Sequence, residues 1–226
     1  MSKAVVVQFG TGDCAEMLRI SGPAHAAYCA RHGFDFRSIM TRQVPQRRPE
    51  WEKVHAIGAA LQAGYELVIW LDADTLIVDP DADLREAIPE GCDLAARKLL
   101  YHLLGRSIQQ FGPLFNFGVV ILRNTPASKR FLEELWEAGP ITKQRCVDKD
   151  GRNWTDAYTV LREEARANWI LQGNRAADAG ELPIVHELEA RFNSFTEYQD
   201  ERPVVMAWHG MQRETTRKRM IAEISQ

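Results

Sequence analysis

The stretch VIWLDADTLIVDP, residues 68–80, carries the strongest indication of fold and function in this chain. An apolar run at residues 67–71, long enough for one buried strand, ends in two carboxylates one residue apart, Asp72 and Asp74. Folding alone does not explain this pair, because an unpaired carboxylate inside a core is strongly destabilising. Ligands bind at the carboxyl ends of strands in α/β sheets, and two carboxylates suit a hard divalent cation that also contacts phosphates. The stretch therefore predicts a cation and phosphate site at the end of a buried strand.

On either side of this stretch, apolar strand-like runs alternate with helical patterns. The order is typical of a mainly parallel central sheet flanked by helices on both faces, so we expect an α/β fold in a single domain, residues 1–226. Strands are predicted at residues 4–9, 34–40, 67–71, 93–97, 115–124 and 203–208. Helices are predicted from an N-cap at Asp13 to Gly33, from Trp51 to Gly64, from Pro126 onward, at 154–167 and at 213–224.

The helix that precedes the first aspartate has one apolar stripe, formed by Trp51, Val54, Ile57 and Leu61. Glu52 and Lys53 fall off that stripe and are expected outside the core. The preceding segment, residues 41–50, contains two prolines and three arginines, which predicts a mobile loop.

Composition excludes several classes of protein. With 45% hydrophobic and 26% charged residues the chain is ordinary for a globular protein, and its net charge of −3 argues against a general nucleic-acid binder. No apolar run approaches the roughly 20 residues that span a bilayer, and no signal peptide is evident, so an integral membrane protein is not expected. The four cysteines are scattered without a CxxC pair, which favours free thiols in a cytoplasmic protein and no zinc cluster.

Weaker signals lie elsewhere in the chain, and each admits a structural explanation. His209 directly follows the last apolar strand, Asn116 and Gly118 straddle the start of the strongest one, and Asp156 lies near the start of a predicted helix. His209 could instead be a surface or hydrogen-bonded histidine, and Asn116 a turn residue. Asp156 could be favoured in the first turn of its helix by the helix dipole.

One rival motif is GTGDCA, residues 10–15, which matches the GxGxxA form of a dinucleotide-binding turn between a strand and a helix. The acidic residue expected at the end of the second strand is missing, because Asp35 lies at the start of that strand and Thr41 and Arg42 follow its end. An NAD(P)-dependent oxidoreductase therefore stays an alternative.

Read in order, WEKVHAIGAALQAGYELVIWLDADTLIVDP, FNFGVVILRN, WTDAYTVL and AWHG resemble the nucleotide-sugar glycosyltransferases with the GT-A fold. The resemblance is greatest to the galactosyl/xylosyl/mannosyl-type retaining group with an Asp-x-Asp (DXD) motif, and it covers about residues 49–210. The late motif, HGMQRETTRK, departs from the His-x-x-Gly-x-x-Lys form of related families.

The resemblance implies a site. Residues 1–110 would form mainly the nucleotide- and metal-binding half, and residues 111–226 mainly the sugar and acceptor half. Mn²⁺ or Mg²⁺ would be held by Asp72, Asp74 and His209, and Asn116 and Asp156 would act on the transferred sugar. The nucleotide-sugar would be bound by Phe9, Gly10, Thr11, Lys53, Asp72, Ala73, Asp74, Gly118, Gly210 and Arg213.

The function implied is metal-dependent transfer of a sugar from a nucleoside-diphosphate sugar, UDP-linked, to an acceptor hydroxyl with retention of configuration. The acceptor is left open among a glycan, a lipid, a small molecule, a protein and a modified nucleic acid. The loop at residues 41–50 would close over the donor and exclude water. A non-catalytic sugar-nucleotide-binding module is the second alternative.

Overall fold

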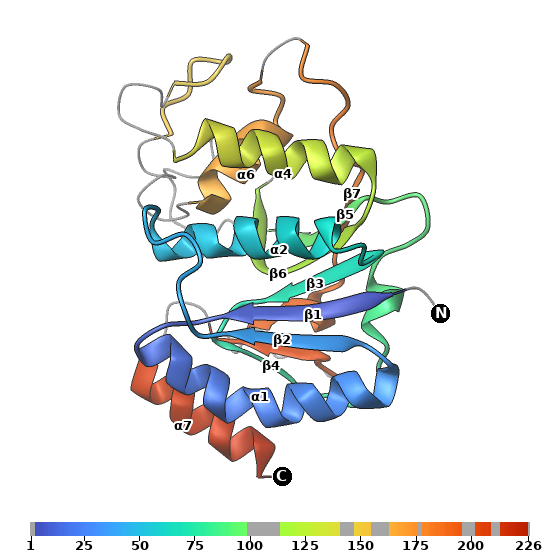
Figure 1. The fold of residues 1–226 in the computed structure, drawn as a ribbon, viewed down its shortest axis with the longest axis vertical. Helices are drawn as coiled ribbons and strands as arrows, with labels where there is room; N and C mark the ends of the chain where they lie inside the picture. Colours follow the sequence, from blue (N-terminus) through green and yellow to red (C-terminus); the bar gives the residue numbers. More distant parts are fainter. Residues whose placement is uncertain are drawn as a thin grey trace.

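A computed structural model describes residues 3–98, 114–140, 147–154, 163–175, 178–195, 202–208 and 213–225. Its centre is a six-stranded sheet in the order β2-β1-β3-β6-β5-β7 (Figure 1). The strands are β1 (Ala4–Phe9), β2 (Asp35–Ile39), β3 (Leu67–Leu71), β5 (Leu94–Lys98), β6 (Phe115–Arg123) and β7 (Val185–Glu187). Only β6 runs antiparallel to its neighbours among these strands, which confirms the predicted, mainly parallel α/β class.

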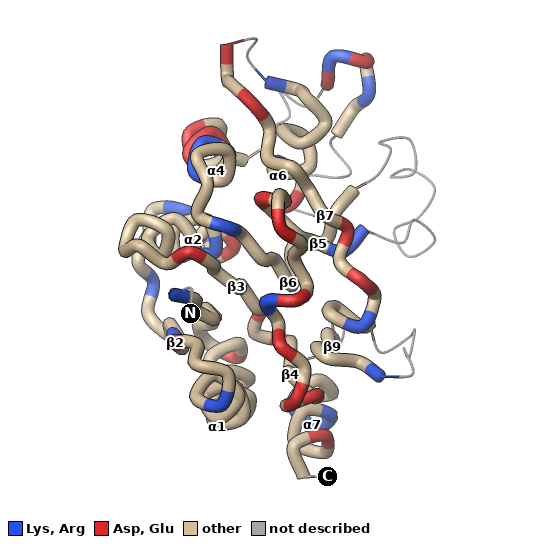
Figure 2. The backbone as a smooth tube through the Cα atoms, turned by 90° about the vertical axis from the view of Figure 1, so that its right-hand side faces the viewer, with Lys and Arg blue, Asp and Glu red and all other residues tan. Residues whose placement is uncertain are grey.

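Helices cover both faces of this sheet, as Figure 1 shows. On one face, α2 (Glu52–Gln62), α4 (Pro126–Ala138) and α6 (Glu163–Leu171) bury a core that includes the predicted apolar stripe of α2. On the other face, α1 (Asp13–His32) packs beside α7 (Arg213–Ile224), and the two helices stay adjacent in a view from the side (Figure 2). A small second sheet, in the order β4-β9-β8, lies on the same side and consists of β4 (Thr75–Ile77), β9 (Val205–Ala207) and β8 (Ser194–Phe195).

Two helix starts differ from the sequence prediction. The N-cap of α1 is Gly12, with φ of 57°, so Asp13 is the first helical residue and no side chain caps the helix. Pro23 lies inside this continuous helix, which ends at Gly33 in the left-handed conformation as predicted. Trp154 is not helical, because it follows a turn in which its indole donates to Asp148, and the described part of the next helix begins at Glu163.

The loop at residues 41–50 is tied to α2 through Glu52, a set of contacts that the prediction of a mobile loop did not include. The Glu52 side chain is buried, and its carboxylate accepts hydrogen bonds from the backbone N–H groups of Gln43 and Val44 and from Arg42 Nε at 2.7 Å. The Arg47 guanidinium stacks on the Trp136 ring at 3.8 Å. A carboxylate that collects several N–H donors explains why Glu52 is buried although it lies off the apolar stripe.

The structure also bears on membrane spans, cysteines and the distribution of charge. None of the helices in the part of the chain that the structure describes is long and apolar enough to cross a membrane. Cys14, Cys29 and Cys92 are free thiols, as predicted, whereas Cys146 lies outside the described residues. On the side of the molecule shown in Figure 2, acidic and basic residues are interspersed along the chain.

Candidate active site

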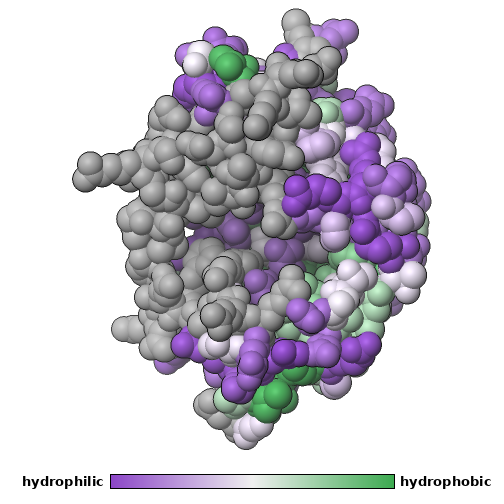
Figure 3. Space-filling view, turned by 90° about the vertical axis from the view of Figure 1, so that its left-hand side faces the viewer, coloured by the Kyte–Doolittle hydropathy of each residue, from purple (hydrophilic) through white to green (hydrophobic). Residues whose placement is uncertain are grey.

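A cleft of about 590 Å³ opens at the carboxyl ends of β1 and β3. Seen from that side, it is a hollow with hydrophilic residues at its base (Figure 3). Its walls come from the ends of both strands, the first turns of α1, the start of α2, α6 and α7. The described lining residues are Phe9, Gly10, Thr11, Cys14, Met17, Pro49, Glu50, Lys53, Trp70, Asp72, Ala73, Asp74, Glu163 and Thr216. Seven residues predicted to bind the nucleotide-sugar are therefore brought together here: Phe9, Gly10, Thr11, Lys53, Asp72, Ala73 and Asp74.

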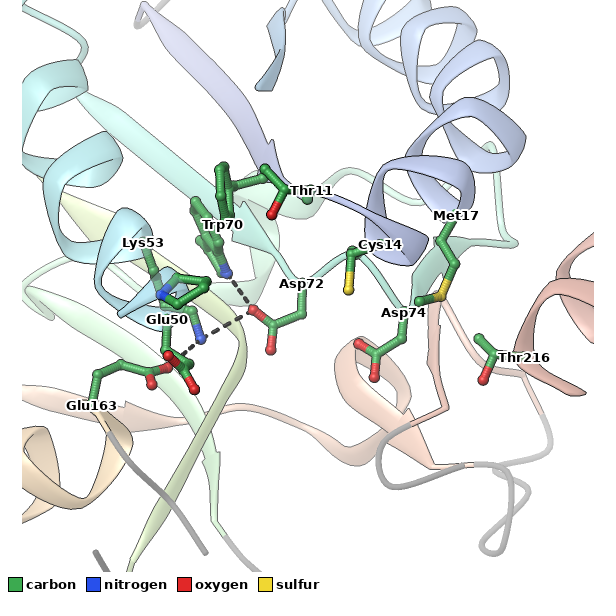
Figure 4. Close-up of a pocket in the computed structure, with 14 residues that line it drawn as sticks. Thr11, Cys14, Met17, Glu50, Lys53, Trp70, Asp72, Asp74, Glu163 and Thr216 are labelled. Carbon is green, nitrogen blue, oxygen red and sulfur yellow. Dashed lines mark hydrogen bonds and ion pairs between the residues drawn. The ribbon is translucent and has the colours of Figure 1, made fainter. Parts of the chain in front are cut away.

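Asp72 and Asp74 lie on the turn between β3 and β4, and both carboxylates point into the cleft (Figure 4). The turn is fixed by its backbone: Asp72 N donates to Gly118 O at 2.8 Å, and Trp208 N donates to Asp74 O at 3.0 Å. Thr75 closes the turn, since its hydroxyl donates to Asp72 O at 2.7 Å. Two distant segments, at Gly118 and Trp208, and the neighbouring Thr75 thus position the two carboxylates.

The Asp72 carboxylate is oriented by two donors on a single oxygen. The indole Nε1 of Trp70 donates to Asp72 Oδ1 at 2.6 Å, and Lys53 Nζ lies 3.0 Å from the same atom. Figure 4 shows the other carboxylate oxygen turned away from both donors. Hydrogen bonds of this kind commonly orient carboxylates that ligate metals.

Lys53 is engaged by acceptors within the protein, and its predicted contact with the nucleotide-sugar stays a prediction. Its ammonium lies 2.7 Å from Phe117 O, 3.1 Å from Glu163 Oε1 and 3.0 Å from Asp72 Oδ1, so its three N–H groups have acceptors inside the protein. Burial disfavours the charged form, but Asp72 and Glu163 outweigh burial and raise the pKa of Lys53 above its ordinary value. Lys53 is therefore a permanent cation that holds Asp72, and it has no donor left for a phosphate.

Glu163 and Glu164, at the start of α6, were not predicted as site residues. Burial raises the pKa of Glu163, the attraction of Lys53 opposes that shift, and Asp72 adds to it. Glu164 Oε2 accepts from Phe117 N at 2.5 Å. The acidic pair was visible in the sequence, but its partners are not local, because Lys53 lies 110 residues before Glu163.

Asn116 and Gly118 are not among the described residues that line the cleft. The pairing of β6 with β5 is interrupted here, since Ala96 pairs with Val120 and Arg97 with Asn116. Asn116 Oδ1 accepts from Gly118 N at 2.9 Å, which satisfies a backbone group that the interruption leaves without a strand partner. In the structure Asn116 supports the strand beside the cleft, and its predicted contact with the sugar stays a prediction.

The other predicted site residues lie wholly or partly outside the description. Asp156, His209 and Gly210 are outside the described residues. Arg213 begins α7, but its side chain is not described.

The residues present fit a hard divalent cation by their chemistry. Asp72 and Asp74 offer carboxylate oxygens, and a cation such as Mn²⁺ or Mg²⁺ is bound by one or two carboxylates together with water and phosphate. Within the described ranges no group of three His, Cys, Asp or Glu side chains is gathered for a metal, so a cation here would have these two carboxylates as its described protein ligands.

Comparison with known proteins supports the resemblance. Residues 5–100 match the model of the galactosyl transferase GMA12/MNN10 family. No functionally curated protein matches the chain.

Solved structures of glycosyltransferases share its fold. A glycosyltransferase involved in glycosylation of the major capsid of PBCV-1 superposes with a TM-score of 0.66 at 12% identity, covering 96% of this chain and 98% of that one. An active-site mutant of LgtC gives 0.56 at 13% identity, covering 98% and 95%. GlyE of Streptococcus pneumoniae gives 0.54 at 14% identity, covering 99% and 63%.

Proposed function

We propose that this chain, a glycosyltransferase with the GT-A fold, moves a sugar from a nucleoside-diphosphate sugar to an acceptor hydroxyl with a divalent cation at Asp72 and Asp74. The family match contains both aspartates, and the fold extends over nearly the whole chain. By resemblance the donor is UDP-linked, the product keeps the donor's configuration, and His209 is the third protein ligand of the metal. Asp156 stays a candidate for contact with the transferred sugar.

The charge balance of the cleft is the observation that carries this proposal. Its described lining contains four carboxylates, those of Glu50, Asp72, Asp74 and Glu163, and one ammonium, that of Lys53. Lys53 is fully engaged by protein acceptors. This surface would repel an anionic diphosphate. A cation bound between the diphosphate and the two aspartates would offset that repulsion and allow the diphosphate to bind in the cleft.

The cation, when bound, supplies charge stabilisation for the leaving nucleoside diphosphate. The protein prepares the ligands for it. Trp70 and Lys53 hold one oxygen of Asp72, which leaves the other directed into the cleft with the Asp74 carboxylate (Figure 4). A carboxylate held this way loses little conformational freedom on binding, and its position does not depend on the substrate.

In this proposal the nucleoside lies against Phe9, Gly10 and Thr11, which line the cleft. Gly10 permits a close approach of backbone segments, because a Cβ there would lie 2.7 Å from Cys14 O. The adjoining wall is uncharged and consists of Cys14, Met17 and Thr216. Such an uncharged wall suits a base and ribose better than it suits a diphosphate.

The transferred sugar is placed toward the opposite end of the cleft, near Glu50 and Glu163. Carboxylate oxygens accept hydrogen bonds from sugar hydroxyls. The loop at residues 41–50 contributes its end, Pro49 and Glu50, to the wall of the cleft, and Glu52 anchors the start of the loop. The acceptor stays open among the five classes that the sequence allows.

A nucleotide screen tests this proposal against its alternatives. Thermal unfolding is followed with UDP, GDP, UDP-sugars, GDP-sugars, NAD and NADP, each with and without Mn²⁺, and released UDP or GDP is then measured. We expect stabilisation by a nucleoside diphosphate only with Mn²⁺, together with slow donor hydrolysis. Stabilisation by NAD(P) without metal would favour an oxidoreductase, and metal-dependent binding without any turnover would favour a binding module.

A further inference from the structure

His25 is a buried histidine that the proposed reaction does not use. It lies in the middle of α1 and makes two polar contacts with other elements. Its Nδ1 lies 2.8 Å from Gln8 Oε1 at the end of β1, and Ile77 N, in β4, donates to its Nε2 at 3.1 Å. The imidazole therefore joins the strand before the cleft to the strand after the Asp72–Asp74 turn.

The polarity of these bonds is fixed by the chemistry of the partners. A backbone N–H can only donate, so Nε2 must accept from Ile77, and the ring proton is on Nδ1, where it donates to Gln8 Oε1. Burial lowers the pKa of His25 from 6.5 to about 3, which keeps this neutral tautomer over the physiological range.

Gln8 connects His25 to the Asp72–Asp74 turn by hydrogen bonds. Its side chain is fully buried, and because Oε1 accepts from His25, its Nε2 is the donor to Asp72 O at 3.4 Å. The same carbonyl accepts from the backbone N–H and hydroxyl of Thr75 at 3.1 and 2.7 Å. The chain of bonds from Ile77 through His25 and Gln8 thus ends on the backbone of the residue that presents its carboxylate to the cleft.

We infer that His25 and Gln8 are positioning residues, which set the backbone of the Asp72–Asp74 turn and so the geometry in which the two carboxylates meet a divalent cation. This role rests on the proposed function as far as the cation is concerned. The positioning of the turn itself is a property of the protein without metal, and it can be measured separately.

Two substitutions by amide side chains each keep one of the two hydrogen bonds of the His25 ring and remove the other. In His25→Asn the amide nitrogen takes the place of Nδ1 and keeps the bond to Gln8, while Ile77 N loses its acceptor. In His25→Gln the amide group takes the place of Nε2 and keeps the bond to Ile77, while Gln8 Oε1 loses its donor. Each variant leaves one partner of the ring unpaired and adds an amide whose other polar group has no described partner, so both are expected to lower stability to a similar extent.

Tyr28→Phe is the matched control on the same helix. The Tyr28 hydroxyl donates to Ala82 O at 2.8 Å and accepts from Leu84 N at 3.0 Å, so it anchors the chain after β4 and does not contact the turn. The variant removes two buried bonds from α1 and should lower the melting temperature without affecting residues 72–75.

The experiment measures amide hydrogen exchange in the metal-free proteins and Mn²⁺ affinity by electron paramagnetic resonance. In His25→Gln the amides of Asp72 and Thr75 should lose about tenfold in protection relative to Val6, and Mn²⁺ should bind about tenfold more weakly, the low end of effects of residues that orient metal ligands. In His25→Asn the loss of protection should shift to Ile77, with Mn²⁺ affinity within about threefold of the original chain. Tyr28→Phe should match the original chain in both measurements on the turn.

Equal protection of Asp72 and Thr75 in His25→Asn and His25→Gln would overturn the inference, as would effects that follow only the melting temperatures of the three variants. If the original chain binds no Mn²⁺ while the exchange pattern appears as expected, the positioning role stands and the proposed metal-dependent function fails.

Discussion

Among the residues of the cleft, Trp70 makes the shortest described hydrogen bond to the Asp72 carboxylate, at 2.6 Å. Trp70→Phe keeps an aromatic ring in the core but removes the indole donor. We expect Mn²⁺ affinity to fall by about tenfold, because one of the two groups that orient Asp72 is lost. Titration of Mn²⁺ by electron paramagnetic resonance checks this.

Trp51→Phe is the control for Trp70→Phe. Trp51 is equally buried in the same core cluster, but the Arg47 guanidinium lies over its ring, it meets Trp136 edge to face, and it has no described bond to the aspartate. It should retain the original Mn²⁺ affinity. Equal weakening in both variants would show that loss of an indole from the core, and not loss of the bond to Asp72, is responsible.

His25 also gives a pH-dependent contribution to stability. Burial lowers its folded-state pKa from 6.5 to about 3, so below pH 6.5 the unfolded chain binds a proton that the folded chain does not. The histidine's contribution to the free energy of unfolding is therefore fully present above pH 6.5 and is lost as the pH falls. Relative to His25→Asn, the original chain should lose about 2 kcal/mol between pH 7 and pH 5, at most about 1.4 kcal/mol per pH unit.

Denaturant unfolding of both proteins at several pH values measures this difference. Tyr28→Phe keeps His25 and should follow the pH dependence of the original chain. Parallel curves for the original chain and His25→Asn would contradict a buried neutral histidine.

The sequence revealed the site residues at the end of β1 and around Asp72 and Asp74 from local patterns, whereas Lys53 was expected only from the resemblance. A buried strand followed by charge is a local pattern, and so is a glycine-rich turn after a strand. The burial of Glu52 and Lys53 was not predictable from their position on the helix, because each side chain is paired by partners that the fold brings from other segments. The same holds for Glu163, whose partner lies on α2.

At the scale of elements, the start of α2 determines the conformation of the loop before it. Glu52→Ala removes the acceptor of the Gln43 and Val44 N–H groups and of Arg42. We expect a loss of about 3 kcal/mol in the free energy of unfolding, since hydrogen bonds to a buried charged group are lost and their donors are left unpaired. Limited proteolysis should then cut residues 41–48 readily.

The original chain should resist cleavage in this loop even without a nucleotide, in contrast to the mobile lid that the composition of the loop predicts. Gln62→Ala, at the exposed end of the same helix, provides the control and should leave the loop resistant. Rapid cleavage of the original chain at residues 41–48 would restore the interpretation as a mobile loop.

Strand positions were predicted well, and helix starts less well. The strands at residues 4–9 and 67–71 coincide with β1 and β3, because continuous apolar runs are the local signature of strands buried on both faces. The N-cap moved from Asp13 to Gly12, since the glycine adopts a positive φ before the helix and no side-chain cap is used. α4 starts at Pro126 as predicted, and the Thr125 hydroxyl caps it by accepting from Ser128 N.

At the scale of the molecule, the alternation of strands and helices predicted the class of fold but not the direction of every strand. β6 reads as an ordinary buried strand, and nothing in its composition shows that it runs antiparallel between β3 and β5. This reversal has a consequence for the site. It brings the start of β6, rather than its end, beside the carboxyl end of β3, so that Gly118 O meets Asp72 N and Phe117 O meets Lys53.

We propose above all that Asp72 and Asp74 hold a divalent cation that binds the diphosphate of a sugar donor. The most direct test is calorimetric titration of UDP with and without Mn²⁺ into the original chain, Asp74→Asn and Asp81→Asn. Asp81 is an exposed aspartate paired with Arg31 away from the cleft, so Asp81→Asn makes the same chemical change at a control site. We predict that UDP binds the original chain and Asp81→Asn only with Mn²⁺, and that Asp74→Asn loses this binding while unfolding at a similar temperature. Equal binding of UDP without metal, or undiminished Mn²⁺-dependent binding by Asp74→Asn, would contradict the claim.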